Sequence, residues 1–269
     1  MKPYTLGFVG AGNMAQAIIN GAIKATIAQA KQIHVYDVDE AKTKGIAQNL
    51  GVHNVRSIAA LCESSDIVVL AVKPNVIAAV LEDIKIYIGS KPVVSIAAGW
   101  SADMIAQIIG TDKCVCRLMP NTPLMVGEGM SVFEIPCSLP KEEMAFIEHI
   151  FSSLGAIAYA PQKAMDAVTA VSGSGPAYVF MFIEALSDAG VLCGLPREQA
   201  TLLAAQTVMG AAKMVLETGS HPGVLKDAVC SPGGTTIEAV KSLEHDGFRG
   251  TVIKAVEKSA KKSKMLSQI

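Results

Sequence analysis

The stretch LGFVGAGNMA, residues Leu6 to Ala15, decides the fold that we expect for this chain. Its first four residues are apolar and predict a strand, and apolar residues at helical spacing follow it. Between the strand and the helix, Gly10, Gly12 and Ala15 stand in the spacing G-x-G-x-x-A. The first glycine permits a tight turn, the second admits a phosphate close to the backbone, and the alanine lets the helix pack on the strand. A chance match is the alternative, but the position between strand and helix favours a dinucleotide-binding turn.

The composition suits a globular chain with a large apolar core. The chain has 269 residues, of which 51% are hydrophobic and 17% charged. Its net charge of −1 gives no electrostatic reason to expect nucleic acid or an anionic membrane as a partner. No apolar run reaches the roughly 20 residues that span a bilayer. The N-terminal residues lack the apolar region and cleavage site of a signal peptide. We therefore expect a cytoplasmic protein without a membrane partner.

The cysteines and histidines are dispersed along the chain. None of the six cysteines forms a C-x-x-C pair, and no histidine stands at zinc-finger spacing from them. Dispersed cysteines in apolar surroundings are typical of reduced thiols in a cytosolic protein. We expect no metal site.

Strands and helices alternate through the first half of the chain. The run DIVVLAV (66–72) is continuously apolar, as expected for a strand covered on both faces of a parallel sheet. We expect strands at 6–9, 32–36, 66–72, 91–97 and 114–118, helices at 74–84 and 101–109, and then strands at 130–135 and 156–160 around a helix at 141–154. This order predicts an α/β fold with a Rossmann-like doubly wound sheet.

Residues that end the strands of such a sheet line its ligand crevice. Asp37 ends the second strand, and its carboxylate is suited to hydrogen bonds from ribose hydroxyls. An acid that caps the next helix is the alternative, and we assign that cap to Asp39. Lys73 ends the third strand, where it meets a ribose or phosphate or remains a solvated lysine. The rigid turn MPNTP (119–123) at the same edge is at least as well explained by a structural role.

From Gln162 onward the sequence is helical in character. We expect a dinucleotide-binding domain over 1–161 and a helical dimerisation and substrate-binding domain over 162–269. A helix at 164–171 is expected to be interrupted at 173–176. The next helix, 177–192, is apolar on nearly all faces, which predicts burial in a dimer interface. Further helices are expected at 197–218, 223–229 and 236–244.

A second candidate site is SPGGTT, residues Ser231 to Thr236. Two glycines followed by threonines at a helix N-terminus present backbone N–H groups that bind a carboxylate without any arginine. Ser231 and Thr236 add hydroxyl groups. The alternative is an ordinary glycine-rich turn in which Thr235 caps the helix.

Five motifs of this sequence resemble those of pyrroline-5-carboxylate reductases in content, order and separation. They are VGAGNMA (9–15), AVKP (71–74), MPNTP (119–123), SGSGPAY (172–178) and SPGGTT (231–236). SGSGPAY with a downstream SPGGTT is the specific part, and the resemblance covers essentially the whole chain. It implies an NAD(P)H-dependent oxidoreductase that reduces the C=N bond of 1-pyrroline-5-carboxylate to give L-proline, the last step of proline biosynthesis. It also implies a homodimer or a larger homo-oligomer of dimers.

The resemblance assigns roles to individual residues. Thr236 matches the threonine that contacts the substrate near its ring nitrogen, which makes it the catalytic candidate. The backbone from Gly233 through Gly234 to Thr235 matches the cradle of the substrate carboxylate, and Ser231 lies beside it. Cofactor-binding positions, with Asp37 added from the argument above, are Val9, Gly10, Ala11, Gly12, Asn13, Met14, Asp37, Ala71, Val72, Lys73, Pro74, Ala97 and Ala98.

Two positions depart from the pattern of the family. Many relatives carry Ser, Asn or Arg where this chain has Asp37, and a carboxylate repels the 2′-phosphate of NADPH. We therefore expect NADH to be used at least as well as NADPH, although Lys42 and Lys44 can soften the repulsion. Ala228 stands where relatives often have Asn, so one polar cofactor contact is expected to be missing.

Two alternatives remain at this stage. A reductase or dehydrogenase of the β-hydroxyacid dehydrogenase type would need a catalytic lysine on a core helix, and residues 164–192 contain none. A non-catalytic NAD(P)H-sensing regulator would need no carboxylate cradle. The sequence offers no strong candidate for a titrating general acid, so the imine proton is expected to arrive with the substrate or through water.

Overall fold

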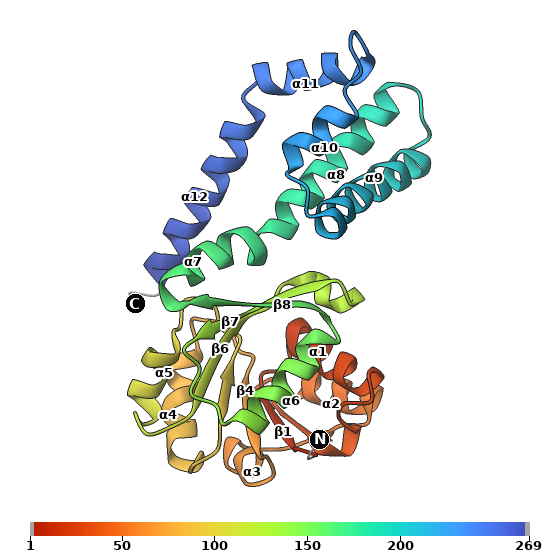
Figure 1. Cartoon of the computed structure of the whole chain (residues 1–269). Coiled ribbons are helices and arrows are strands. Elements are labelled where there is room, and N and C mark those ends of the chain that lie inside the picture. The colour runs from red at the N-terminus through yellow and green to blue at the C-terminus, as the bar shows by residue number, and fades with distance from the viewer. Residues whose placement is uncertain (1–2, 267–269) are drawn as a thin grey trace. The chain divides into compact units, whose positions relative to one another are not determined.

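The computed structural model describes residues 3–266 (Figure 1). The chain forms two compact units. The first contains the residues up to Ser174 together with those from Ser259 onward, and the second is Gly175–Lys258. This division by contacts differs from the boundary after residue 161 that the change in sequence character indicates, and that boundary stays a prediction. Each unit is described by itself.

The first unit is built on an eight-stranded sheet in the order β3-β2-β1-β4-β5-β6-β7-β8. Its strands are β1 (Leu6–Val9), β2 (Ile33–Tyr36), β3 (His53–Asn54), β4 (Ile67–Leu70), β5 (Val93–Ser95), β6 (Val115–Met119), β7 (Gly129–Ile135) and β8 (Gly155–Pro161). All neighbouring strands from β3 to β6 are parallel, β6 and β7 are antiparallel, and β7 and β8 are parallel. The order reverses between β1 and β4, where open α/β sheets bind their ligands.

Helices cover both faces of this sheet, as Figure 1 shows. They are α1 (Asn13–Lys24), α2 (Glu40–Leu50), α3 (Ile58–Glu63), α4 (Ile77–Tyr87), α5 (Ala102–Ile109) and α6 (Lys141–Ser152). One buried apolar cluster joins the sheet to α1, α2 and α6, and a second joins it to α3, α4 and α5. The doubly wound α/β fold is therefore confirmed.

The start of α4 differs from the expectation that Pro74 opens this helix. The helix begins at Ile77 after Val76, whose N–H donates to the carbonyl of Lys73 at 3.1 Å. Pro74 lies in the turn before the helix, and the indole N–H of Trp100 donates to its carbonyl at 3.3 Å. The turn therefore keeps residues 73–76 at the end of β4, beside the switch point of the sheet.

The helix is interrupted near the expected residues 173–176, but the interruption begins earlier, and Ser174 is the single non-helical residue in it. After α7 (Met165–Val168), residues Thr169–Gly173 form a π-helical turn and α8 (Gly175–Leu192) follows. The N–H of Ser174 donates to the carbonyl of Thr169 at 2.8 Å, which is the wider spacing of a π-turn. Pro176 lies in the first turn of α8, where its missing N–H costs nothing.

The helical stretch Gln162–Leu192 is long enough and apolar enough to cross a membrane by length and composition. The stretch has 31 residues, and an 18-residue window of it has a mean hydropathy of 1.2, with 6% of that window buried. The expectation that no stretch reaches this length is therefore wrong. The same length and composition also suit a helix that is buried between subunits.

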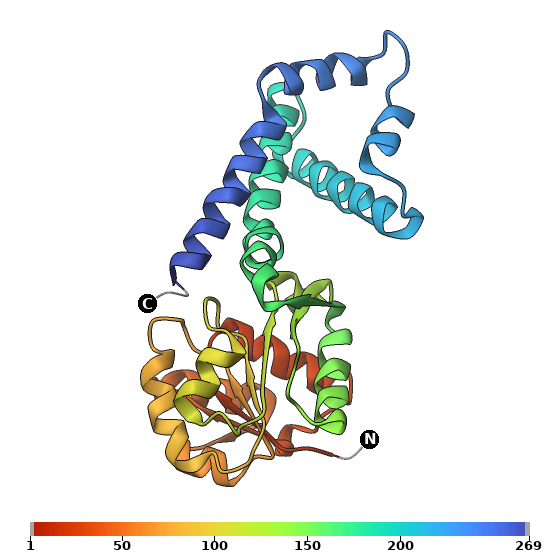
Figure 2. The ribbon, with the colours of Figure 1, turned by 60° about the vertical axis from the view of Figure 1, so that its left-hand side comes forward.

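The second unit contains the remaining helices, which Figure 2 shows from another side. After α8 they are α9 (Arg197–Thr218), α10 (Pro222–Ala228), α11 (Thr235–His245) and most of α12 (Phe248–Leu266). Packing of α8 on α9 includes a 2.8 Å hydrogen bond between the hydroxyls of Ser187 and Thr201. In the first unit, the end of α12 is tied to α7 because the hydroxyl of Ser263 donates to Asp166 at 2.6 Å.

Candidate functional site

The glycine turn after β1 has the geometry that its sequence predicts. Gly10 has φ +106°, and a Cβ at this position would lie 2.5 Å from the carbonyl oxygen of Ala71. Gly12 precedes α1 and has open space where a Cβ would point. No side chain caps this helix, so its first N–H groups are available to an anion. The residues present therefore fit a pyrophosphate at the N-terminus of α1.

Asp37 is tied to this turn. One carboxylate oxygen accepts a hydrogen bond from the N–H of Ala11 at 2.8 Å, and the other accepts from the N–H of Asp39 at 2.9 Å. A carboxylate offers about four acceptor positions, so two remain for hydroxyl groups. Asp39 caps α2 by accepting from the N–H of Ala41 at 3.1 Å, which confirms the cap that we assigned to it.

A groove of about 450 Å³ runs from the glycine turn along the ends of β1, β2 and β4. It brings together most of the predicted cofactor positions, namely Val9, Gly10, Gly12, Asp37, Ala71, Val72 and Lys73. Residues without a prediction also line it, namely Tyr36, Val38, Val76, Ala79, Val80 and Asp83, together with Lys42. Their signal in the sequence was their place at the end of β2 and just after it, early in α2, or at the start of α4.

Other predicted cofactor positions lie outside this groove. Ala97, at the end of β5, is 3% exposed and belongs to the buried cluster under α4 and α5. Its neighbour Ala98 is partly exposed but does not line the groove. Pro74 lines a separate cavity beside Trp100. The remaining positions, Ala11, Asn13 and Met14, belong to the turn and to the start of α1 without lining the groove.

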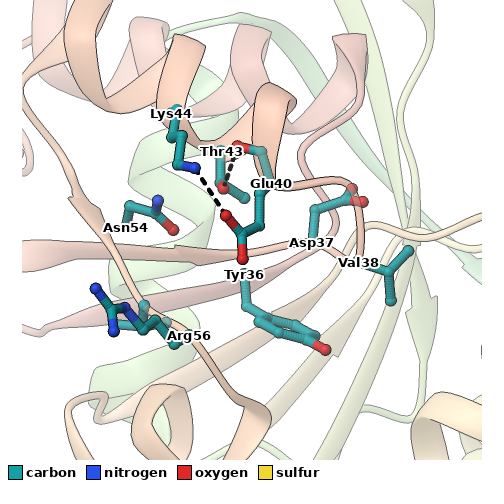
Figure 3. A pocket seen from close by; sticks show the side chains of 9 residues that line it. Tyr36, Asp37, Val38, Glu40, Thr43, Lys44, Asn54 and Arg56 are labelled. Atoms are coloured by element: carbon teal, nitrogen blue, oxygen red, sulfur yellow. Dashed lines mark hydrogen bonds and ion pairs between the residues drawn. The ribbon is translucent and has the colours of Figure 1, made fainter.

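A second pocket of about 530 Å³ adjoins the groove and shares Tyr36, Asp37 and Val38 with it (Figure 3). Within it, Lys44 donates to Glu40 at 2.7 Å, and this ion pair holds the pKa of Glu40 below its usual range. Figure 3 shows the carboxylate of Asp37 pointing away from Lys44.

The two lysines that were expected to soften the charge of Asp37 already pair with other acids. Lys44 pairs with Glu40, and Lys42 lies 3.4 Å from Asp39. Exposed pairs of this kind are weak, because water and salt screen them. Lys42 nevertheless lines the same groove as Asp37, whereas Lys44 lines the adjoining pocket.

The loop SPGGTT of the second unit has an open helix N-terminus. Gly233 has φ +68°, and the N–H of Gly234 donates to the carbonyl of Ser231 at 3.0 Å. Gly234 is the residue before α11, so the alternative in which Thr235 caps the helix is wrong. Within the described part of the chain, the hydroxyls of Thr235 and Thr236 have no hydrogen-bond partner. The loop therefore presents free backbone N–H groups and free hydroxyls with no cation among its six residues.

The MPNTP turn has a structural role that sequence left open. The side-chain oxygen of Asn121 accepts from the N–H of Met130 at 2.8 Å, and its NH₂ donates to the carbonyl of Ser172 at 3.2 Å. Asn121 thereby fixes the end of β6 against β7 and against the π-helical turn.

Comparisons with known proteins agree with the glycine turn of the first unit and with the SPGGTT loop of the helical unit. Residues 162–266 match a family model for pyrroline-5-carboxylate reductase dimerisation, and residues 5–99 match one for coenzyme F420-dependent NADP oxidoreductases. The chain is 46% identical to pyrroline-5-carboxylate reductase of Escherichia coli over 98% of both proteins. It is 44% identical to that of Glycine max over 99% of this chain and 97% of the relative.

Solved structures show the same likeness. A pyrroline carboxylate reductase of Plasmodium falciparum with NADP bound superposes with a TM-score of 0.90 at 37% identity, and 99% of each chain is covered. A pyrroline-5-carboxylate reductase of Coxiella burnetii gives 0.89 at 35% identity with the same coverage. The chain belongs to the pyrroline-5-carboxylate reductase family.

Proposed function

We propose that this chain is an NAD(P)H-dependent oxidoreductase that reduces 1-pyrroline-5-carboxylate to L-proline, the last step of proline biosynthesis. The observation that carries the proposal is the full-length similarity to reductases of that name, 46% identity over 98% of the chain. The glycine turn and the SPGGTT loop supply a place for each of the two reactants, which the similarity alone does not provide.

The glycine turn holds the cofactor in this proposal. The N–H groups that open α1 bind the pyrophosphate, and Gly10 and Gly12 keep the backbone free of side chains there. Lys73 and the neighbouring residues Ala71 and Val72 line the groove that leads away from the turn. When bound, NAD(P)H supplies the hydride for reduction of the imine carbon.

The SPGGTT loop holds the substrate. The N–H groups of Gly233 and Thr235 bind the carboxylate beside Gly234, whose own N–H donates to Ser231, and Thr236 hydrogen-bonds the ring nitrogen with its free hydroxyl. Ser231 adds a further hydroxyl. Reduction of C=N is faster when the nitrogen is protonated, and a loop without a cation does not oppose that positive charge. Dipoles and hydroxyls therefore serve this substrate better than an arginine would.

The carboxylate of Asp37 favours NADH. Its two bonds to backbone N–H groups fix it at the glycine turn, and its remaining acceptor positions suit the 2′- and 3′-hydroxyls of the adenosine ribose. A 2′-phosphate at the same place meets a fixed negative charge. We therefore propose that NADH is used at least as well as NADPH.

The dimerisation family match over residues 162–266 supports a homo-oligomer, and we propose that α8 contributes to the dimer interface. Phe180 and Met181 on this helix are 63% and 69% exposed in the single chain, which is unusual for large apolar side chains that do not contact a partner. We propose a cytoplasmic enzyme, because cysteines stay reduced there and all six cysteines are free in the structure.

The direct test supplies the purified protein with 1-pyrroline-5-carboxylate and follows oxidation of NADH and of NADPH in parallel. The proposal expects oxidation that depends on the substrate and yields proline. Cofactor binding without oxidation would instead identify a nucleotide-sensing protein.

Thr236→Ala tests the substrate loop. Loss of a hydrogen bond to a charged group corresponds to about 1.5–3 kcal/mol, so kcat/KM is expected to fall roughly tenfold to a hundredfold. Thr251→Ala is the matched control, because its hydroxyl bonds the carbonyl of Gly247, the residue directly before α12. Undiminished turnover of the Thr236 variant at saturating substrate would remove this residue from the mechanism.

A further inference from the structure

Three sulfur atoms meet where β6 and β7 lie beside α6. Cys116 on β6 is fully buried, Cys137 follows the end of β7 and is half-buried, and Met144 belongs to α6. The sulfur atoms of Cys137 and Met144 are 3.7 Å apart. The thiol of Cys116 donates to the carbonyl of Arg117 at 3.9 Å, and it is close enough to Cys137 to shift the pKa of that thiol. The proposed reductase activity uses none of these groups.

The antiparallel pairing of β6 and β7 brings the two cysteines together. Leu118 pairs with Phe133, so the chain after β7 runs back along the beginning of β6. On one side of Cys116, Arg117 forms a buried ion pair with Glu134 at 3.0 Å. On its other side, the N–H of Val115 donates to the hydroxyl of Ser138 at 2.8 Å. Residues 134 and 138 are therefore both fixed to β6, which keeps Cys137 between them beside the strand that carries Cys116.

Only one of the two thiols ionises readily. The neighbouring Cys116 thiol, as a hydrogen-bond donor to the Cys137 thiolate, lowers the pKa of Cys137 to about 7, aided by the backbone N–H of Leu139. The same interaction, together with burial, raises the pKa of Cys116. The pair thus holds one negative charge near neutral pH, on the sulfur that is nearer to solvent. A partly exposed thiolate beside a second thiol is the arrangement of peroxide-sensitive cysteine pairs.

We propose that Cys116 and Cys137 form a dithiol site that a hydroperoxide converts to an intramolecular disulfide. The Cys137 thiolate attacks one oxygen of hydrogen peroxide, the O–O bond breaks, and hydroxide leaves, which produces a sulfenic acid on Cys137. The Cys116 sulfur then attacks the Cys137 sulfur, the S–O bond breaks, and water leaves after protonation. One S–S bond forms, the two thiols lose two electrons, and the peroxide is reduced to two molecules of water.

The other cysteines provide the contrast that the test needs. Cys193 is exposed and belongs to the second unit. Cys62 is buried, and burial raises its pKa. Cys114 lies two residues before Cys116 on β6 and is the nearest alternative partner in sequence.

The experiment treats the full-length protein with hydrogen peroxide, blocks the remaining thiols under denaturing conditions and measures the intact mass and the tryptic peptides. We expect loss of two of the six free thiols, and one link between the peptide of residues 114–117 and the peptide of residues 118–141. Dithiothreitol reverses the loss. Because the shorter peptide holds both Cys114 and Cys116, Cys114→Ser must keep the link and Cys116→Ala must abolish it.

Cys137→Ser must abolish the link as well, and Cys193→Ser serves as the matched control that leaves the link unchanged. A thermal unfolding curve of each variant shows whether it is folded, and Cys114→Ser gives a second test if Cys116→Ala is not. A link that persists in Cys116→Ala, or that disappears in Cys114→Ser, overturns the assignment. Oxidation of Cys193 while Cys116 and Cys137 both stay reduced overturns the proposal.

Discussion

At the scale of single residues, Asp37 carries the choice of cofactor. We predict that Asp37→Ser shifts the ratio of kcat/KM values toward NADPH by roughly tenfold or more, because it removes a charge equivalent to about 1.4 kcal/mol. Steady-state kinetics with both cofactors measure this ratio. Asp39→Ser is the control, since Asp39 caps α2 and is two residues away. An equal loss with both cofactors would show that Asp37 acts only by holding the N–H of Ala11.

Gly10 is the residue at which backbone geometry matters most. We predict that Gly10→Ala abolishes nucleotide binding, because φ is +106° and the new Cβ would lie 2.5 Å from the carbonyl of Ala71. Titration calorimetry with NADH or NADPH measures the loss. Gly45→Ala on α2 is the matched control, since nothing lies within 4 Å of its Cβ position and alanine favours a helix by about 1 kcal/mol. Normal affinity in Gly10→Ala would exclude this turn as the pyrophosphate site.

At the scale of elements, the edge strand β3 and its neighbour β2 hold a histidine pair that makes stability depend on pH. The rings of His34 and His53 stack with centroids 5.0 Å apart, and Nδ1 of His34 is buried without a partner among the described residues. Burial, followed by the nearby charge of His53, lowers the pKa of His34 from its usual 6.5.

Because the folded state keeps His34 neutral at a pH where the unfolded chain is protonated, the unfolded chain binds more protons below pH 6.5. The titration of His34 therefore lowers the free energy of unfolding as the pH falls below 6.5, and this loss is absent above that pH. We predict that His34→Gln makes the free energy of unfolding decline less between about pH 7.5 and 5.5, as measured by urea denaturation. His149→Gln on the exposed side of α6 is the control, and an identical slope in wild type and His34→Gln would contradict the account.

The elements also show how far the sequence determines the fold. Seven of the eight strands are predictable, because each is an apolar run bounded by turn residues, and α9 has the predicted bounds 197–218. The two-residue strand β3 has no periodicity to detect, and it exists because His53 and Asn54 pair with β2. The helix α12 was missed because its sequence is rich in lysine and polar on average.

The candidate sites are predictable to a different extent. The glycine turn can be located from the sequence because steric constraints leave only glycine at Gly10. The tie between Asp37 and Ala11 joins residues from β2 and from the turn after β1, so it depends on strand order. For the same reason, the contact of Cys116 with Cys137 cannot be predicted without the β6–β7 register.

At the scale of the whole molecule, exposed apolar side chains on α8 indicate assembly. We predict that Met181→Glu weakens the dimer at least tenfold, because a carboxylate in an apolar interface loses its hydration. Sedimentation velocity over a range of protein concentrations measures the dissociation. Ile86→Glu is the matched control, since Ile86 is 72% exposed on α4 and lies outside the dimerisation match at 162–266. A Met181→Glu protein that assembles like wild type would exclude this part of α8 from the interface.

The central claim is that hydride passes from the nicotinamide to the imine carbon of 1-pyrroline-5-carboxylate. The most direct measurement uses reduced cofactor that carries deuterium at nicotinamide C4 and analyses the proline by mass spectrometry and NMR. The account predicts one deuterium per L-proline, on the ring carbon that was double-bonded to nitrogen. Absence of proline, or proline without deuterium at that carbon, would contradict it.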